Sequence, residues 1–446
     1  MMASAEPSPS QIVRDSIATF GLRVLLYAFG LAVAVVVSRA LGPVGRGDYY
    51  LLVVAASTLV AVGKLGLEQA NVYLYSTKGI GSSRLNGQNG LVALVAGGLA
   101  ATAMIVVPSL QPDLAVPDRL ALILASLAIP LNLHIALTAG LQNLAGEVTW
   151  QFKAGLAGVL LQLALLGVAA AVRPLSASAV LLVSLIATAA GWLVLVRDPG
   201  AITRPAIRLD PRLLVSSLRQ SLVLHLAMVL FFLQLRLDTF LVSAIAGLAS
   251  LGIYSLGVLM AETTYLVTDS LALAILPRQM ETALSDAAKL ALRGLRINAL
   301  LGVAMAIGWI VLGMPLIGIL FGPDFSGAYA ALVALLPGSI AMGMQRMCGP
   351  IVLRSGTPVR LVAIYGLALV VNIILNLMWI PTLGIVGAAL ASSVSYILNA
   401  GLIIAWTARV SGPVSFESLV PGRAELVLLA QGAVRVGNTV RSLGRR

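Results

Sequence analysis

Charged side chains inside long apolar segments are the residues of this chain that could do chemistry. The chain is 59% hydrophobic and only 10% charged. A charge at bilayer depth costs about 3 kcal/mol or more, so it usually faces the interior of a helix bundle or a wet cavity. Several such charges therefore predict a polar path through the bundle. They are Arg23, Lys64, Glu68, Arg236, Asp238, Glu262, Asp269 and Arg346.

The four cations in this set have the chemistry of a phosphate site. Arginine offers a planar fork of donors that suits phosphate oxygens, and lysine offers a compact point charge. Arg23 and Lys64 belong to the first half of the chain, and Arg236 and Arg346 belong to the second. We therefore predict a cationic cavity built from both halves. The alternative for each cation is an internal ion pair, and Arg346 also lies near enough to a helix end to reach the interface.

The acids have two competing roles. Lys64 and Glu68 are four residues apart on one helix face, so they can pair with each other. Arg236 and Asp238 are two apart and point in different directions, so each needs a partner elsewhere. Intramembrane carboxylates commonly relay ions in transporters, and they also neutralise buried cations. The candidates for ion coupling or counter-charge are Glu68, Asp238, Glu262 and Asp269.

Polar, uncharged side chains in the apolar segments are candidates for lining the same path. They are Gln142, His225, Gln234, Asn372 and Asn376. Hydrogen bonding between helices is an equally good explanation for them. A single cysteine, Cys348, and two histidines exclude a disulfide framework and make a metal cluster improbable. We expect no metal site, no cofactor and no set of catalytic residues.

The apolar segments predict an all-α polytopic membrane protein. A spanning helix needs roughly 20 mainly apolar residues, and the chain offers about 12 such segments. They cover residues 16–39, 48–76, 86–107, 118–142, 150–172, 175–197, 218–245, 249–276, 295–321, 326–353, 360–381 and 384–408.

Most of the 29 basic residues lie in the segments between apolar runs that face the cytoplasm if both termini are cytoplasmic. This bias predicts a multi-pass protein of a bacterial inner membrane with both termini inside. It also explains the net charge of +12 without a nucleic-acid partner.

The longest inner gap divides the chain into two predicted halves. We expect a six-helix bundle at 1–197, a cytoplasmic linker at 198–217, a second six-helix bundle at 218–408 and a basic amphipathic tail at 409–446. The same motif stands at the start of the second and of the eighth predicted span. Its residues are Gly42, Gly47 and Tyr49 in the first copy, and Gly247, Gly252 and Tyr254 in the second, with identical spacing. This match indicates a parallel pseudo-repeat, an arrangement that places transport sites between halves around a central cavity.

Several motifs resemble those of bacterial polysaccharide exporters. One is the stretch from Arg39 to Tyr49, which has the pattern R-x-L-G-P-x-x-x-G-x-Y. A second is Gly63 to Ala70 in the second span, and a third is Asp238 with Gly252 and Tyr254. The most specific is the block from Asn372 to Ala389, N-x-x-L-N followed by I-P and G-I-x-G-A-A.

This pattern is similar to the O-antigen and polysaccharide flippases of the multidrug/oligosaccharidyl-lipid/polysaccharide exporter superfamily. The resemblance implies alternating access by two bundles and a cargo of isoprenoid-pyrophosphate-linked oligosaccharide, moved from the inner to the outer leaflet among membrane lipids. Polysaccharide-assembly enzymes are the implied protein partners. The competing functions are a cation-coupled multidrug exporter, a lipid II flippase and a membrane scaffold for polysaccharide-assembly enzymes. A membrane-embedded polymerase is disfavoured because no predicted outer loop is large.

Overall fold

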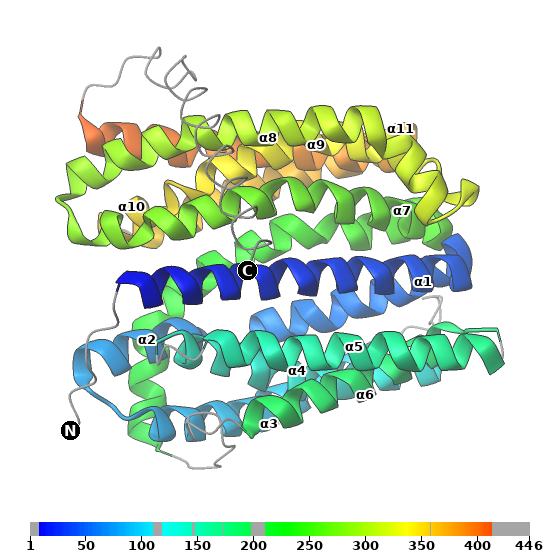
Figure 1. Cartoon of the computed structure of the whole chain (residues 1–446), viewed down its shortest axis with the longest axis horizontal. Helices are drawn as coiled ribbons and strands as arrows, with labels where there is room; N and C mark the ends of the chain where they lie inside the picture. Colours follow the sequence, from blue (N-terminus) through cyan, green and yellow to red (C-terminus); the bar gives the residue numbers. More distant parts are fainter. Residues whose placement is uncertain are drawn as a thin grey trace. The chain divides into compact units, whose positions relative to one another are not determined.

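The computed structural model describes residues 9–109, 118–144, 148–172, 174–197, 210–356 and 358–412, and every regular element in these ranges is helical. The predicted all-α class is therefore confirmed (Figure 1). The helices are α1 (Pro9–Gly63), α2 (Leu67–Lys78), α3 (Ser82–Ser109), α4 (Arg119–Leu144), α5 (Val148–Val172), α6 (Ala177–Val196), α7 (Pro211–Glu281), α8 (Leu284–Leu320), the short 3₁₀ helix η1 (Pro323–Phe325), α9 (Ala328–Arg346), α10 (Gly349–Arg354) and α11 (Pro358–Ser411).

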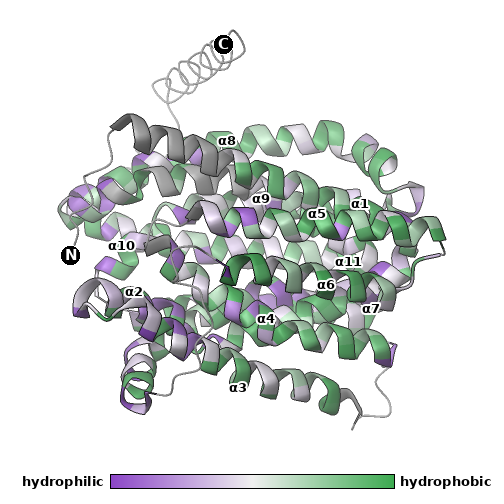
Figure 2. Cartoon of the chain, turned by 60° about the horizontal axis from the view of Figure 1, so that its bottom comes forward, coloured by the Kyte–Doolittle hydropathy of each residue, from purple (hydrophilic) through white to green (hydrophobic). Residues whose placement is uncertain are grey.

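Apolar side chains cover the outer faces of these helices. Leu99 on α3, Val172 on α5 and Ile319 on α8 are 69%, 78% and 68% exposed. Figure 2 shows apolar residues along most of the long helices. Nine helical stretches of the described residues are long and apolar enough to cross a membrane. Exposed leucine and valine on such helices suit lipid rather than water, so the chain is a multi-pass membrane protein.

Three of the long helices are interrupted by a glycine with non-helical dihedrals. These residues are Gly42 in α1, Gly247 in α7 and Gly384 in α11. Gly42 and Gly247 lie between two predicted spans, and Gly384 is the first residue of the twelfth predicted span, so each long helix has two arms. The total of twelve crossings stays a prediction.

The chain divides into two compact units, residues Met1–Phe232 and Leu233–Arg446. The division falls inside α7, which begins at Pro211. Residues 211–217 were expected in the linker, and they are helical instead. The reason is a good start signal: the Asp210 carboxylate accepts a hydrogen bond from the Leu213 N–H at 3.1 Å, and Pro211 suits the first helical position.

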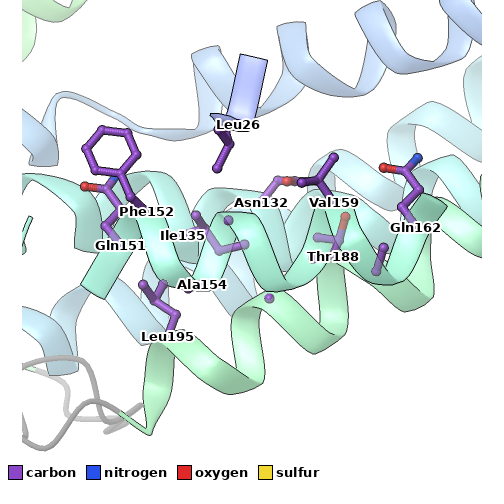
Figure 3. Close-up of a pocket in the computed structure, with 14 residues that line it drawn as sticks. Leu26, Asn132, Ile135, Gln151, Phe152, Ala154, Val159, Gln162, Thr188 and Leu195 are labelled. Carbon is purple, nitrogen blue, oxygen red and sulfur yellow. The ribbon is translucent and has the colours of Figure 1, made fainter. Parts of the chain in front are cut away.

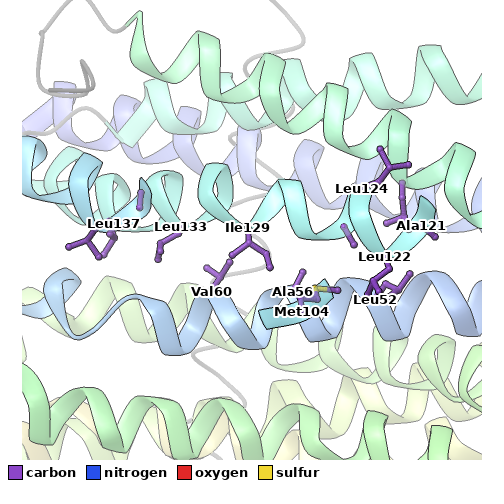
Figure 4. Close-up of a cluster of buried hydrophobic side chains, with 14 of the residues drawn as sticks. Leu52, Ala56, Val60, Met104, Ala121, Leu122, Leu124, Ile129, Leu133 and Leu137 are labelled. Carbon is purple, nitrogen blue, oxygen red and sulfur yellow. The ribbon is translucent and has the colours of Figure 1, made fainter. Parts of the chain in front are cut away.

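The core of the first unit lies between α1, α3 and α4. Leu52, Ala56 and Val60 of α1 face Ile129 and Leu133 of α4, and all five are buried (Figure 4). Helices α5 and α6 pack closely on each other. A Cβ on Gly158 of α5 would lie 3.0 Å from the Ala187 carbonyl oxygen of α6. Small residues of this kind let membrane helices approach closely.

The second span of the first unit is not continuous, contrary to the prediction of one segment over 48–76. Helix α1 ends at Gly63 and α2 begins at Leu67. Between them Leu65 and Gly66 adopt positive φ angles of 50° and 76°. A Cβ on Gly66 would lie 2.5 Å from Ser221 Oγ on α7, so glycine is required there. The predicted segment 326–353 is similarly interrupted, because α9 ends at Arg346 and α10 begins at Gly349.

In the second unit, α9 packs against both α8 and α11, and α11 also contacts α8. Its interior is rich in small and polar residues. Ser393 Oγ donates to the Ala334 carbonyl at 2.5 Å, and Asn298 Nδ2 donates to the Gly343 carbonyl at 2.9 Å. Such bonds hold membrane helices together, because an apolar helix surface packs as well against lipid as against another apolar helix.

The internal repeat has a structural counterpart in the backbone. Gly42 has φ 64° and ψ −177°, and Gly247 has φ 84° and ψ 170°. Tyr49 packs against a buried cluster that contains Val33, nine residues before Gly42. In the second unit Tyr254 instead contacts Asp238, nine residues before Gly247. The two turns are alike, and the side chains that they bring together differ.

Candidate functional site

A buried carboxylate lies between α7 and α11 of the second unit. Asp238 on α7 is 2% exposed. Its Oδ2 accepts hydrogen bonds from the Tyr254 hydroxyl at 2.5 Å and from Ser392 Oγ at 3.0 Å, and its Oδ1 accepts from the Thr239 N–H at 2.8 Å. Donors on three sides satisfy the carboxylate within α7 and α11, as the burial of a charged group requires.

Amides and hydroxyls of α11 extend this site. Asn372 Nδ2 donates to Ser395 Oγ at 3.2 Å, and Asn376 Nδ2 donates to Asn372 Oδ1 at 3.0 Å. Gln234 Nε2 on α7 donates to the Ser395 carbonyl at 3.1 Å, and Asn399 Nδ2 donates to Gln234 Oε1 at 3.0 Å. We call the set Asp238, Tyr254, Ser392, Ser395, Asn372, Asn376, Gln234 and Asn399 the α7–α11 polar cluster.

Two oxygens of the α7–α11 polar cluster are buried acceptors with no donor among the described residues. They are Oδ1 of Asn376 and Oδ1 of Asn399. Buried polar atoms in folded proteins are normally satisfied, so such exceptions indicate a bound water or ion. One carboxylate with several neutral oxygen donors is a ligand set for a small hard cation or for a proton.

A second pair connects the two arms of α7. Arg236 Nη1 lies 2.8 Å from Glu262 Oε1, and the two side chains are 23% and 26% exposed. Gly247 reverses the helix between them, which brings these residues into contact. The sequence left open whether Glu262 neutralises Arg236 or relays an ion, and the contact shows neutralisation in this conformation.

In the first unit, Lys64 and Glu68 form the ion pair that their spacing predicts. Lys64 Nζ lies 2.9 Å from Glu68 Oε2, and the side chains are 30% and 35% exposed. The pair lies at the break between α1 and α2. His225 on α7 contacts this break, since its Nε2 lies 3.1 Å from the Val62 carbonyl oxygen. The Val62 carbonyl also accepts from the Leu65 N–H at 3.3 Å, so His225 provides a second contact where the regular helix ends.

A pocket of about 360 Å³ lies between α1, α4, α5 and α6 of the first unit (Figure 3). Its wall is mainly apolar, with Asn132, Gln151, Gln162 and Thr188 as polar exceptions. Gln142 does not line it. That side chain is 0% exposed, and neither amide atom has a partner among the described residues. Gln142 is thus a buried polar group of α4 in this conformation.

The remaining candidates are less well placed. The backbone of Arg23 lies in α1 and that of Asp269 in α7, but their side chains are outside the described residues, as is the tail at 413–446. Arg346 is exposed in the last turn of α9, where a cation interacts well with the helix dipole. This position agrees with the alternative that it reaches the interface.

Sequence reasoning missed four members of the α7–α11 polar cluster as site residues: Tyr254 was noted only in a motif, and the three residues of α11, Ser392, Ser395 and Asn399, were not noted. A signal was present, because these three residues recur at i, i+3 and i+7 inside an apolar segment and therefore share one helix face. Because serine is common in membrane helices, this spacing does not indicate a site by itself. It becomes informative once Asp238 is known to contact the same helix face.

A family model described as "Polysaccharide biosynthesis protein" matches residues 36–330. The chain belongs to this family. The match covers α1 to α9 in part or whole, including Lys64, Asp238 and Glu262, and it confirms the resemblance to polysaccharide exporters. No curated protein matches the chain in sequence.

The fold of this polysaccharide biosynthesis family member is that of known exporters. A structure titled "Lipid II flippase MurJ, inward closed conformation" superposes with a TM-score of 0.66 at 16% identity, covering 91% of this chain and 89% of that one. An inward-facing multidrug resistance MATE family transporter of the MOP superfamily gives 0.61 at 15% identity, covering 89% and 98%. A MOP superfamily transporter from Pyrococcus furiosus, whose title notes a reverse polarity of its binding pocket, gives 0.60 at 15%, covering 90% and 95%.

Proposed function

We propose that the chain is a flippase that moves an isoprenoid-pyrophosphate-linked oligosaccharide from the inner to the outer leaflet of a bacterial plasma membrane. Family membership supports a role in cell-surface polysaccharide synthesis. The fold supports transport by alternating access rather than an enzyme reaction. Both termini are cytoplasmic in this proposal, and the isoprenoid chain stays in lipid throughout.

The observation that carries the proposal is a pair of partly exposed cations inside apolar helices. Lys64 and Arg236 each pair with a carboxylate, and their side chains remain 30% and 23% exposed. A pyrophosphate competes well for such cations, because it offers more charge and more acceptor oxygens than one carboxylate. Cargo binding then exchanges Glu68 and Glu262 for phosphate. Arg23 and Arg346 complete the proposed cation set.

The α7–α11 polar cluster is the proposed site of ion coupling. Asp238 is the one acid in this cluster, and two acceptor oxygens of Asn376 and Asn399 are free to ligate among the described residues. A proton or a sodium ion at Asp238 neutralises the carboxylate and changes its bonds to Tyr254 and Ser392. Those bonds join the two arms of α7 and link them to α11, so occupancy changes helix packing.

The test is leaflet sidedness of lipid-linked oligosaccharide in proteoliposomes that contain the purified protein, with and without a sodium or proton gradient. We expect protein-dependent movement that a gradient accelerates. The double variant Arg23→Gln/Lys64→Gln should abolish movement while the protein stays folded. Unchanged movement in that variant rejects the cationic site.

Other outcomes of the same assay select the rival functions. Movement of lipid II alone identifies a lipid II flippase. Gradient-driven movement of organic cations, with no movement of any lipid-linked headgroup, identifies a multidrug exporter. Absence of all transport, together with capture of polysaccharide-assembly enzymes, identifies a scaffold.

A further inference from the structure

A basic groove lies in the first unit, at the opposite end of α2 from the Lys64–Glu68 pair. It has a volume of about 1240 Å³ and is lined by the end of α2, the start of α3 and the first turns of α7. Its charged residues are Lys78, Arg84, Asp210, Arg212 and Arg219. Figure 1 shows α2 beside the first turns of α7, and Leu74 and Leu213 belong to one buried apolar cluster.

The single acid of the basic groove already has two partners. Asp210 accepts a hydrogen bond from Arg84 and also caps α7 through the Leu213 N–H. No described acid pairs with Lys78, Arg212 or Arg219, and all three side chains are exposed. The basic groove therefore keeps three positive charges that no described carboxylate neutralises.

The wall of the basic groove is amphipathic. Tyr73 and Val215 line it with 37% and 64% of their surface exposed, beside Ser216 and Gln220. Apolar side chains beside cations suit a ligand that has an anionic head and an acyl chain. A soluble anion needs no such wall.

The position of the groove along the helices places it at the membrane surface. Helix α2 ends at Lys78, α3 begins at Ser82 and α7 begins at Pro211, so the apolar segments of all three terminate here. The charge bias of the sequence predicts that this surface is cytoplasmic, where anionic lipids concentrate. The N-terminus of α3 adds a partial positive charge.

We propose that the basic groove binds the phosphate headgroup of an anionic membrane lipid, with Lys78, Arg212 and Arg219 contacting the phosphate and Tyr73 and Val215 contacting the acyl chain. Two lipids carry this chemistry: bulk phospholipid of the inner leaflet, and an isoprenyl pyrophosphate. The residues that line the basic groove include neither Lys64 nor Arg236, and the proposal does not depend on the proposed flippase activity.

The experiment measures lipid binding to the purified full chain in neutral detergent by native mass spectrometry. Phosphatidylglycerol, phosphatidylcholine, an isoprenyl pyrophosphate and inorganic pyrophosphate are titrated separately. The test variant is Lys78→Gln/Arg212→Gln/Arg219→Gln. The matched control is Arg278→Gln/Arg293→Gln/Arg409→Gln, which removes three exposed cations from the second unit. A charge-conserving variant, Lys78→Arg/Arg212→Lys/Arg219→Lys, checks that loss reflects charge and not misfolding.

We expect the test variant to bind phosphatidylglycerol about 100-fold more weakly than the native chain, since each surface cation contributes about 1 kcal/mol. The control and the charge-conserving variant should stay within about threefold. Preference for isoprenyl pyrophosphate over phosphatidylglycerol assigns the groove to that lipid, and equal affinity assigns it to bulk phospholipid. Equal binding of phosphatidylcholine, no loss in the test variant, or binding of inorganic pyrophosphate alone overturns the proposal.

Discussion

The hydroxyl of Tyr254 donates a hydrogen bond of 2.5 Å to the carboxylate of Asp238, and the two residues lie on opposite sides of the Gly247 turn in α7. This bond ties one arm of the helix to the other. Ser392 contacts the same oxygen from α11. A change in the charge of Asp238 therefore alters contacts with both arms of α7 and with α11.

The first prediction concerns Asp238 itself. Asp238→Asn keeps the shape of the side chain but removes its charge, so it can no longer bind a cation. We expect gradient-driven transport in proteoliposomes to fall at least tenfold, and the response to the gradient to disappear. Tyr254→Phe is the control, since it removes one donor to the carboxylate and costs about 1–3 kcal/mol of stability. A gradient response that survives in Asp238→Asn rules out coupling at this site.

The second prediction separates cargo binding from pairing at Lys64. Glu68→Gln removes the competing carboxylate, so pyrophosphate should bind Lys64 more tightly and transport at low cargo concentration should rise. Lys64→Gln should do the opposite. Both side chains are about one third exposed, so the stability of either variant should change by less than about 1 kcal/mol. Cargo binding to the purified protein measures the effect.

A matched control for that prediction lies at the start of α8. Asp286 pairs with Lys289 at 3.1 Å, and both side chains are exposed. Asp286→Asn frees a lysine at the surface, where no cargo contact is proposed. An equal rise in cargo affinity in Asp286→Asn and Glu68→Gln would show that net charge, and not Lys64, is responsible.

The third prediction uses a charge swap to distinguish structure from function. Arg236→Gln and Glu262→Gln each remove this ion pair, and we expect each to lower the unfolding temperature. The swap Arg236→Glu/Glu262→Arg places opposite charges at the two positions that form the native 2.8 Å pair, and it should recover most of that loss. Transport should stay impaired, because the cation has moved to the other arm of α7. Full recovery of transport would make the pair purely structural.

The fourth prediction concerns two adjacent glycines of α3. A Cβ on Gly97 would lie 2.8 Å from the Pro130 Cα of α4, whereas a Cβ on Gly98 would have nothing within 4 Å. Gly97→Ala should therefore destabilise the protein by about 1–3 kcal/mol. Gly98→Ala should be neutral or stabilising by up to about 1 kcal/mol, because alanine favours helix. Thermal unfolding in detergent compares them, and equal effects would contradict this packing.

The fifth prediction is a pH dependence at the mouth of the basic groove. The hydrogen bond from Arg84, followed by the backbone N–H of Leu213, lowers the pKa of Asp210 below its usual value of about 3.9. A carboxyl whose folded pKa is lowered stabilises the protein above its unfolded pKa, and this stability is lost as pH falls through the folded pKa. Asp210→Asn still caps α7 but carries no charge.

The unfolding temperatures of native protein and Asp210→Asn should accordingly differ between pH 5 and 7 and converge as the pH falls below about 3.9. Arg84→Gln should reduce the difference at every pH. A difference that grows as the pH falls would reverse the sign and exclude the contact between Arg84 and Asp210 as its source.

The helical class, the family and the Lys64–Glu68 pair were predictable because each depends on local sequence. Apolar length predicts a spanning helix. Helical spacing predicts the Lys64–Glu68 pair, although the pair forms across the turn between α1 and α2 and not along one continuous helix. The partners of Arg236 and Asp238 were not predictable, since they depend on how the Gly247 turn orients two arms of one helix. The break at Leu65 and Gly66 was missed because the apolar length of 48–76 favours one continuous span, and neither the two glycines nor Lys64 and Glu68 show by themselves that the helix stops there.

The shared turn at Gly42 and Gly247 sets a limit on energy conversion. Both copies keep the glycine and the tyrosine, yet Val33 stands where the second copy has Asp238. Under the proposed coupling, the duplicated position therefore supplies one ion-binding carboxylate per chain and not two. One monovalent ion crossing a potential of 100 mV yields about 2.3 kcal/mol, which supports about a 50-fold cargo gradient. A steeper gradient would require removal of cargo at the outer leaflet.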